Sequence, residues 1–205
     1  RSVPLSKCMD DAMIALYQNG ERVRPEQGYP LRLFLPGWEG NMSVKWLRRL
    51  KVGDQPFQTR EETSKYTDSM PDGSARQFTF DMEAKSVITQ PAPELVLKGA
   101  GLYQISGLAW SGYGKIKKVE VSADGGRTWA EADLQQPVRT LALVRFRMPW
   151  KWDGQPAILQ SRATDETGYV QPTRQQMLDV RGKWANYHGN CITSWAVEPD
   201  GKVKH

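Results

Sequence analysis

Four positive side chains fall within seven residues of the chain: Lys45, Arg48, Arg49 and Lys51. Arg32 precedes them, and the glycines at 37 and 40 lie between. Arginine offers paired N–H donors, lysine offers a compact charge, and glycine allows the backbone to approach a ligand closely. The combination is suited to binding a phosphate or another oxyanion. A basic strand edge that faces water is the alternative, since runs of charge are usually solvated.

The residues before this cluster predict the strand that positions it. Leu31, Leu33 and Leu35 alternate with Arg32 and Phe34, which is the period of an extended segment with one buried face. Arg32 is therefore expected on the opposite face. The chain then turns at Pro36 and the glycines and enters a second apolar run that carries the four cations.

Two further segments flank the cluster in the first 85 residues. The acidic pair at 10–11, the apolar run AMIALYQ and the Asn19-Gly20 pair predict a short helix over residues 12–18. Residues 53–85 are polar and show no clear period, so they predict an extended loop. Tyr66 lies in that loop, where a single tyrosine is usually a packing or hydrogen-bonding residue.

From residue 86 the sequence consists of about seven short runs of strand type, separated by Pro, Gly, Asp and Asn: SVIT, ELVLKG, YQISGLAW, KIKKVEVS, RTWAEADL, TLALVRFRM and AILQSRAT. Their number and spacing predict an immunoglobulin-like β-sandwich. Residues 122–129 fit a hairpin turn closed by Trp129. The last segment, 183–205, has apolar residues but a weak pattern.

Composition narrows the possible functions. The net charge of +5 is spread thinly, with 13 basic and 12 acidic residues over 1–85 and 15 and 11 over 86–205, so nucleic-acid binding is not indicated. The two histidines and the two cysteines, Cys8 and Cys191, form no metal-binding pattern. No stretch approaches the roughly 20 apolar residues of a membrane helix.

The runs YQNG at 17–20, QGYPLR at 27–32, PG at 36–37 and VKWL at 44–47 resemble, in order and spacing, the sulfite oxidase family of molybdopterin oxidoreductases. The longer versions EQGYPLR and PGWEGN are most similar to family members that act on sulfane sulfur in bacterial sulfur oxidation (Sox). The resemblance covers nearly the whole chain. It implies a mostly β (α+β) fold, with the C-terminal half of a molybdopterin-binding domain at 1–85, an Ig-like dimerisation domain at 86–182 and a tail at 183–205.

The resemblance also implies roles for single residues. Arg32 and Lys45 match positions that contact the molybdenum-molybdopterin cofactor, and Gln27 stands where most relatives have a histidine, so it keeps a hydrogen-bonding group but not a titrating one. Tyr66 resembles the active-site tyrosine of the family. Arg145 resembles an arginine that the dimerisation domain contributes to the substrate pocket, although by itself it reads as a solvated strand residue.

The implied function depends on residues beyond those of this chain. The family's molybdenum ligand is a cysteine in the first half of the molybdopterin-binding domain, and neither Cys8 nor Cys191 matches its position. The resemblance therefore implies a cofactor shared with an N-terminal half, and a chain that is inactive alone. The implied reaction is oxo transfer to reduced sulfur, either sulfane sulfur on a carrier protein or sulfite, with electrons passed to a c-type cytochrome in the periplasm.

A second hypothesis needs no catalysis. The region from residue 86 could be an Ig-like dimerisation or interaction module with a short basic extension, which would form a homodimer whether or not a cofactor is bound. Stabilisation of residues 1–85 by a cofactor would distinguish the two hypotheses, because a ligand that binds the folded state raises its stability.

Overall fold

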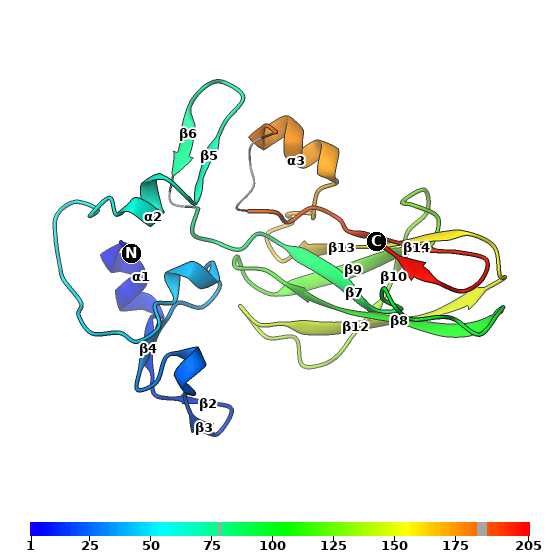
Figure 1. Ribbon diagram of the computed structural model, residues 1–205, viewed down its shortest axis with the longest axis horizontal. Coiled ribbons are helices and arrows are strands. Elements are labelled where there is room, and N and C mark those ends of the chain that lie inside the picture. The colour runs from blue at the N-terminus through cyan, green and yellow to red at the C-terminus, as the bar shows by residue number, and fades with distance from the viewer. Residues whose placement is uncertain (78, 184–187) are drawn as a thin grey trace. The chain divides into compact units, whose positions relative to one another are not determined.

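The computed structural model describes residues 1–77, 79–183 and 188–205. They form two compact units (Figure 1), Arg1–Asp81 with Val180–Gly189 and Met82–Asp179 with Asn190–His205. The chain thus passes from the first unit to the second near residue 82 and returns to the first for one short segment. The boundary predicted at residue 86 lies close to the first crossing.

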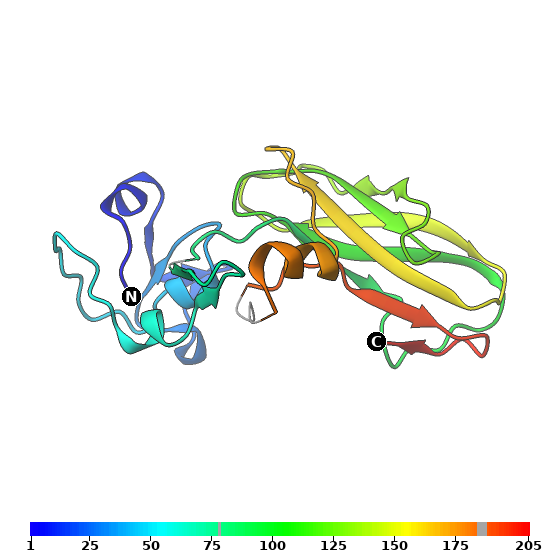
Figure 2. The ribbon, with the colours of Figure 1, turned by 90° about the horizontal axis from the view of Figure 1, so that it is seen from above.

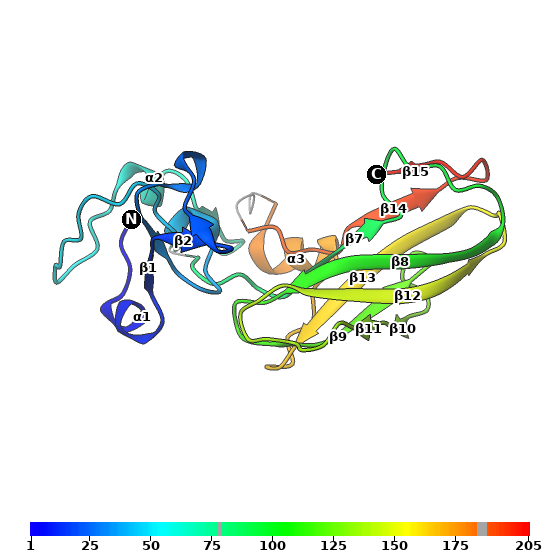
Figure 3. The ribbon, with the colours of Figure 1, turned by 90° about the horizontal axis from the view of Figure 1, so that it is seen from below.

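The second unit is a sandwich of two sheets. One sheet has the order β10 (Ala130–Glu131), β9 (Ile116–Ser122), β13 (Ala157–Asp165), β14 (Ser194–Val197) and β15 (Val203–Lys204). The other has the order β11 (Asp133–Leu134), β12 (Val144–Trp152), β8 (Gly101–Trp110) and β7 (Lys85–Gln90), and Figure 3 shows the last three side by side. The predicted mostly β fold is confirmed.

Alternation along the strands builds the core between the sheets. In β12, Val144 and Phe146 are buried while Arg145 and Arg147 are exposed, because successive side chains of a strand point to opposite faces. The buried residues of both sheets form one cluster of sixteen apolar side chains. This unit therefore has a core of its own.

The predicted hairpin at 122–129 joins β9 to β10. The Asp124 carboxylate accepts hydrogen bonds from the Thr128 hydroxyl at 2.6 Å and backbone N–H at 2.9 Å, and these hold the pKa of Asp124 well below its usual range. The indole N–H of Trp129 closes the turn on the Gly126 carbonyl at 3.0 Å. The Arg162 guanidinium lies 4.3 Å from the Trp129 ring. The motif is a turn device, as its sequence indicates.

Three predictions for this region need correction. The run at 94–99 forms only an isolated bridge between Val96 and Lys202, and the run at 127–134 divides into β10 and β11, one in each sheet. The tail is more ordered than its pattern suggests, since β14 pairs with β13 (Figure 2) and β15 pairs with β14. The indole of Trp195 donates to the Ile88 carbonyl at 2.9 Å and so ties the tail to the sandwich.

The first unit begins with α1 (Leu5–Asp10) and continues with β1 (Met13–Ala15), β2 (Tyr17–Gln18) and β3 (Glu21–Arg22). The helix predicted over 12–18 is wrong. Asn19 and Gly20 have φ angles of 53° and 84°, so they form the tight turn of the β2–β3 hairpin and not the end of a helix. β1 pairs with β4 (Arg32–Phe34).

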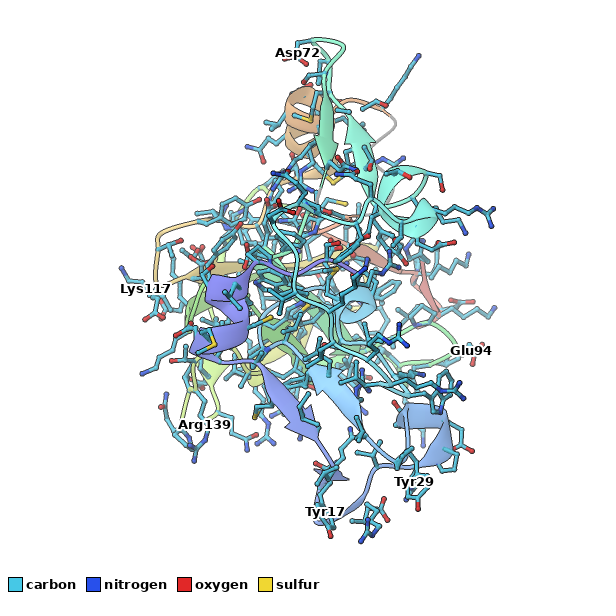
Figure 4. The ribbon with its side chains drawn as sticks, turned by 90° about the vertical axis from the view of Figure 1, so that its left-hand side faces the viewer. Tyr17, Tyr29, Asp72, Glu94, Lys117 and Arg139 are labelled. Atoms are coloured by element: carbon cyan, nitrogen blue, oxygen red, sulfur yellow. The ribbon has the colours of Figure 1, made fainter. Side chains whose placement is uncertain are left out.

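Residues 53–85 are also more structured than predicted. Thr59 and Glu62 form a capping box that starts the short helix α2 (Arg60–Thr63). β5 (Thr67–Ser69) and β6 (Ala75–Gln77) form a hairpin with Asp72 at its tip (Figure 4). The remaining elements are η1 (Pro25–Gln27), η2 (Gly40–Met42) and α3 (Arg174–Arg181). Within the described ranges, no helix is long and apolar enough to span a membrane.

Candidate functional site

The basic cluster of the first unit is assembled by β4. The Leu33 N–H donates to the Val44 carbonyl at 2.9 Å, and the Leu47 N–H donates to the Leu31 carbonyl at 3.1 Å. These bonds hold residues 44–47 along one edge of β4, while β1 occupies the other edge. Lys45 is thereby fixed beside Arg32, thirteen positions away in the sequence.

Arg32 and Lys45 converge on the η1 loop. The Arg32 guanidinium donates from Nη1 to the Gln27 carbonyl at 3.1 Å and from Nη2 to the Ser43 carbonyl at 2.9 Å. Lys45 Nζ donates to the Glu26 carbonyl at 2.6 Å. The two cations therefore lie together and donate to adjacent carbonyl groups of one loop, and their roles in binding an anion stay predictions.

Gly28 allows this close arrangement. Its φ angle is 115°, and a β-carbon there would lie 3.1 Å from the Cα and Cβ atoms of Lys45 and 3.2 Å from Cβ of Arg32. A side chain at this position would therefore push the two cationic residues away from the loop. The Gly28 N–H itself donates to the Pro25 carbonyl at 3.1 Å. The donors open to an anion thus come from side chains and not from the loop backbone.

Unused donors at this cluster fit a large anionic cofactor. Arg32 Nε is buried and has no hydrogen-bond partner among the described residues. Buried polar groups are normally satisfied, so this N–H suits a ligand acceptor. Lys45 carries three N–H donors, and the side chain of Gln27 is exposed at the same loop. Guanidinium, ammonium and amide groups are the donors that phosphate and pterin ring edges accept.

Tyr66 lies at the junction of α2 and β5, elsewhere in the first unit. Its φ angle of 56° is unusual for a residue with a side chain, and such strained backbone is common at functional sites. The Arg1 guanidinium lies 4.9 Å from the centre of its ring. Ser2 donates its backbone N–H to Glu62, so the N-terminal residues pack on the elements that hold Tyr66.

Glu62 anchors this junction. It is buried, which by itself raises its pKa, but hydrogen bonds from the Thr59 hydroxyl and from the backbone N–H groups of Ser2 and Thr59 outweigh burial and lower the pKa overall. The carboxylate is therefore held ionised as an acceptor for three donors. The carboxylate thus ties the N-terminal residues to the start of α2.

Arg145 lies in the second unit, on the exposed face of β12. It is the cross-strand partner of Leu108, and Arg147 follows it on the same face opposite Asp133. Its backbone carbonyl accepts the Gln135 N–H at 2.8 Å, which fixes the strand and leaves the guanidinium on the surface. The structure thus brings Gln27, Arg32 and Lys45 together, whereas Tyr66 and Arg145 belong to other parts of the chain.

A buried contact between a carboxylate and a histidine was not predicted from the sequence. His188 Nδ1 lies 2.6 Å from Glu39 Oε1, and the two side chains are 8% and 13% exposed. Arg181, also buried, donates to the His188 carbonyl at 2.9 Å. The contact with Glu39 holds His188 against the turn that follows β4, and Arg181 in turn binds the His188 carbonyl. The only local signal was Glu39 within the PGWEGN motif.

We expect Glu39→Ala to destabilise the first unit by about 1–3 kcal/mol, because the substitution removes a hydrogen bond between two buried side chains. Urea unfolding, monitored by hydrogen exchange at the amides of residues 31–47, measures the change in the free energy of unfolding. Glu21→Ala is the matched control, since its pair with Arg24 has a 2.7 Å contact but side chains that are 56% and 69% exposed. Equal effects of the two substitutions would contradict a stabilising role for the Glu39–His188 pair.

The described residues contain no group of three or more His, Cys, Asp or Glu side chains that could hold a metal ion. Cys8 and Cys191 are both free, and they lie in different units. Any metal bound at the cluster would therefore need ligands from beyond these residues.

Comparison with known proteins gives two family models that match adjacent parts of the chain. Residues 1–61 match the oxidoreductase molybdopterin binding domain, and residues 76–194 match the Mo-co oxidoreductase dimerisation domain. The dimerisation model thus covers most of the sandwich and more than half of the chain.

Curated and solved relatives agree with these models. Mouse mitochondrial sulfite oxidase is 30% identical over 203 residues, and the nitrate reductase of Pichia angusta is 35% identical over 153 residues. The crystal structure of the sulfane dehydrogenase SoxCD from Paracoccus pantotrophus matches 99% of this chain with a TM-score of 0.96 and 53% identity. The matched regions span 37% of the mouse enzyme, 18% of the nitrate reductase and 52% of the sulfane dehydrogenase chain.

Proposed function

Because the chain belongs to the sulfite oxidase family of molybdopterin oxidoreductases, we propose that it is part of an enzyme that oxidises reduced sulfur by oxo transfer. The substrate proposed is sulfane sulfur on a carrier protein, and sulfite is the alternative. The 53% identity to a sulfane dehydrogenase over 99% of this chain supports the first substrate, while 30% identity to a sulfite oxidase supports the second less strongly.

The observation that carries the proposal is the convergence of Arg32 and Lys45 on the η1 loop. Bound molybdenum-molybdopterin would supply the two-electron oxidation and the oxygen transfer. Arg32 and Lys45 would hold its negatively charged groups, with the guanidinium offering the buried Nε–H that has no described partner. Gln27 would add a neutral hydrogen bond at the same loop.

Two other residues would act on the substrate. The Tyr66 hydroxyl would donate a hydrogen bond to an oxygen on sulfur, and the Arg145 guanidinium would stabilise the negative charge that develops there. Neither would need to transfer a proton.

The proposal extends to partners and location. The dimerisation-domain match supports a homodimer formed through the sandwich. A c-type cytochrome would accept the electrons, a carrier protein would present sulfane sulfur, and the enzyme would work in the periplasm, as the sequence resemblance implies. Each of these is a prediction for the complete enzyme.

We expect Arg32→Met to lower the molybdopterin content of the assembly purified through a tag on this chain by about 10- to 100-fold. Hydrogen bonds from charged groups are worth about 1.5–3 kcal/mol each, which corresponds to that loss in affinity. Metal analysis gives the molybdenum content, and fluorescence of the oxidised pterin gives the cofactor content. Arg32→Lys keeps the charge but not the paired donors. Its cofactor content is expected to lie between those of the unsubstituted assembly and Arg32→Met.

Arg48→Met is the control, because it removes the same charge from an exposed position of the same cluster. It is expected to leave the cofactor content unchanged. If the unsubstituted assembly holds neither molybdenum nor pterin, the proposed function is wrong. If both arginine variants lose cofactor equally, the general charge of the cluster matters and the geometry at Arg32 does not.

The non-catalytic Ig-like module is the second candidate function. One observation favours it, namely the complete core of sixteen buried side chains in the sandwich. If the chain is a non-catalytic module, preparations with and without cofactor have the same free energy of unfolding. If it is part of a molybdopterin enzyme, the cofactor raises the free energy of unfolding of the first unit alone.

A further inference from the structure

Trp46 completes a row of side-chain donors on the η1 loop. The two cations of the cluster bind the carbonyls of Glu26 and Gln27, the second and third residues of the loop. The carbonyl of the first residue, Pro25, accepts a hydrogen bond of 3.0 Å from the indole Nε1 of Trp46. The same carbonyl accepts the Gly28 N–H at 3.1 Å, the bond that closes the turn. Each of the three successive carbonyls is therefore held by a side chain from outside the loop.

The backbone of Trp46 adopts a conformation that is unusual for a residue with a side chain. Its φ angle is 50°, in the left-handed region, where a β-carbon crowds the backbone and glycine is free of strain. The Leu47 N–H donates to the Leu31 carbonyl at 3.1 Å and so fixes the chain directly after this residue. Strained backbone of this kind is common at functional sites. The backbone alone would favour glycine here, so the indole needs another explanation.

The ring of Trp46 also orients Lys45. The Lys45 ammonium lies 5.6 Å from the centre of the ring, within the range of a cation–π interaction, and it donates to the Glu26 carbonyl at 2.6 Å. A lysine side chain is flexible, so two contacts restrict where its charge lies better than one. The bond to Glu26 uses one N–H and leaves two of the three ammonium donors for a ligand. Trp46 therefore acts both on the loop and on the cation beside it.

We propose that Trp46 is a positioning residue of the cofactor site. Its indole holds the η1 loop and the Lys45 ammonium in the arrangement that receives the negatively charged groups of the cofactor, and it acts through these neighbours. A site that is ordered before its ligand arrives loses less entropy on binding, so fixed donors bind more tightly than mobile ones. This role rests on the proposed function, because it takes molybdenum-molybdopterin as the ligand.

Trp46→Gly tests this role, because it removes both indole contacts and relieves the left-handed backbone. The cofactor content of the assembly purified through a tag on this chain is expected to fall by about 5- to 20-fold, since one hydrogen bond and one cation–π contact are lost. Metal analysis and pterin fluorescence measure the cofactor content. Trp46→Phe keeps a ring beside Lys45 but loses the N–H donor. Its cofactor content is expected to lie between those of the unsubstituted assembly and Trp46→Gly.

Two measurements on cofactor-free assembly, prepared from a host that makes no molybdopterin, separate positioning from stability. The amides of residues 27–29 donate to the carbonyls of Arg24 and Pro25, and in Trp46→Gly they are expected to exchange about 10-fold faster. The midpoint of urea unfolding is expected to change little, because relief of the strained backbone offsets the lost hydrogen bond. If the midpoint falls and the amides of the sandwich also exchange faster, Trp46 has a merely structural role and the proposal is wrong.

Trp129→Phe is the matched control. The Trp129 indole donates to the Gly126 carbonyl at 3.0 Å, the same length as the bond from Trp46, but in a hairpin of the second unit. This substitution is expected to leave the cofactor content and the exchange of residues 27–29 unchanged. Full cofactor content in Trp46→Gly would overturn the positioning role alone, whereas an unsubstituted assembly without molybdenum and pterin would overturn the proposed function as well.

Discussion

Replacing Arg145 by methionine is expected to lower kcat/KM of the complete enzyme for an oxyanionic sulfur substrate by about 100- to 1000-fold, because removing one donor to a developing oxyanion costs about that much. Methionine keeps an unbranched, flexible side chain but removes the charge and the N–H donors of the guanidinium. The loss is expected in kcat as well as in KM, since the interaction strengthens as charge develops on the oxygens. Steady-state kinetics with sulfite and an artificial electron acceptor measure both parameters.

Arg147→Met is the matched control for this prediction. Arg147 lies two residues further along β12, on the same exposed face, and has Asp133 as its cross-strand partner. If general positive charge on this face attracts the substrate, both variants lose activity equally and the loss falls as salt is added. If Arg145 acts on the substrate itself, Arg147→Met retains nearly full activity.

The basic cluster shows how much local sequence pattern can predict. Alternation at Leu31, Leu33 and Leu35 predicts the strand, and Leu33 and Leu35 are buried as that pattern requires. Because the strand and the cationic run are joined by a short turn, their proximity follows from chain connectivity. The sequence motifs at 17–20, 27–32, 36–37 and 44–47 predict the family, the mostly β fold and the molybdenum-molybdopterin cofactor. The comparisons confirm all three. The roles of single residues stay predictions.

Contacts between segments that are far apart in the chain leave no pattern in the local sequence from which they could be predicted. Glu39 and His188 are 149 positions apart, and nothing in the sequence around either residue indicates that the two side chains are buried together. Their pairing depends on the chain returning to the first unit after the sandwich, which no periodicity encodes. The tail strand β14 is similar, because it forms only where β13 offers an edge.

The helix predicted over residues 12–18 is wrong for a physical reason that bears on β1. A continuous apolar run is consistent with either a buried helix or a strand covered on both faces, and periodicity alone does not separate them. Asn19-Gly20 fits the end of a helix, but the same pair is also the strongest short signal for a tight hairpin. The apolar run is therefore equally consistent with the strand that the structure shows, β1 at Met13–Ala15.

The largest effect on stability is expected at Phe146, which is fully buried in the sandwich and is the cross-strand partner of Gly107. Phe146→Ala is expected to destabilise the second unit by about 4 kcal/mol through lost burial and the cavity that remains. Gly107→Ala is expected to cost about 3 kcal/mol for the opposite reason, since its β-carbon would lie 2.4 Å from the Phe146 ring and 2.2 Å from the Val87 carbonyl. Urea unfolding followed by tryptophan fluorescence measures both, because Trp150 and Trp152 belong to the same core.

The double variant separates the two contacts of Gly107. Removing the Phe146 ring relieves one clash but leaves the Val87 carbonyl, which is backbone of the neighbouring strand β7 and cannot move away cheaply. Gly107→Ala is therefore expected to cost about 1–2 kcal/mol less in the Phe146→Ala background than alone. Leu102→Ala, at a 76% exposed position of the same strand, is expected to change stability by less than about 0.5 kcal/mol. Strict additivity of the two core substitutions would show that the ring does not cover Gly107, and the sandwich core would then be packed differently from the arrangement described.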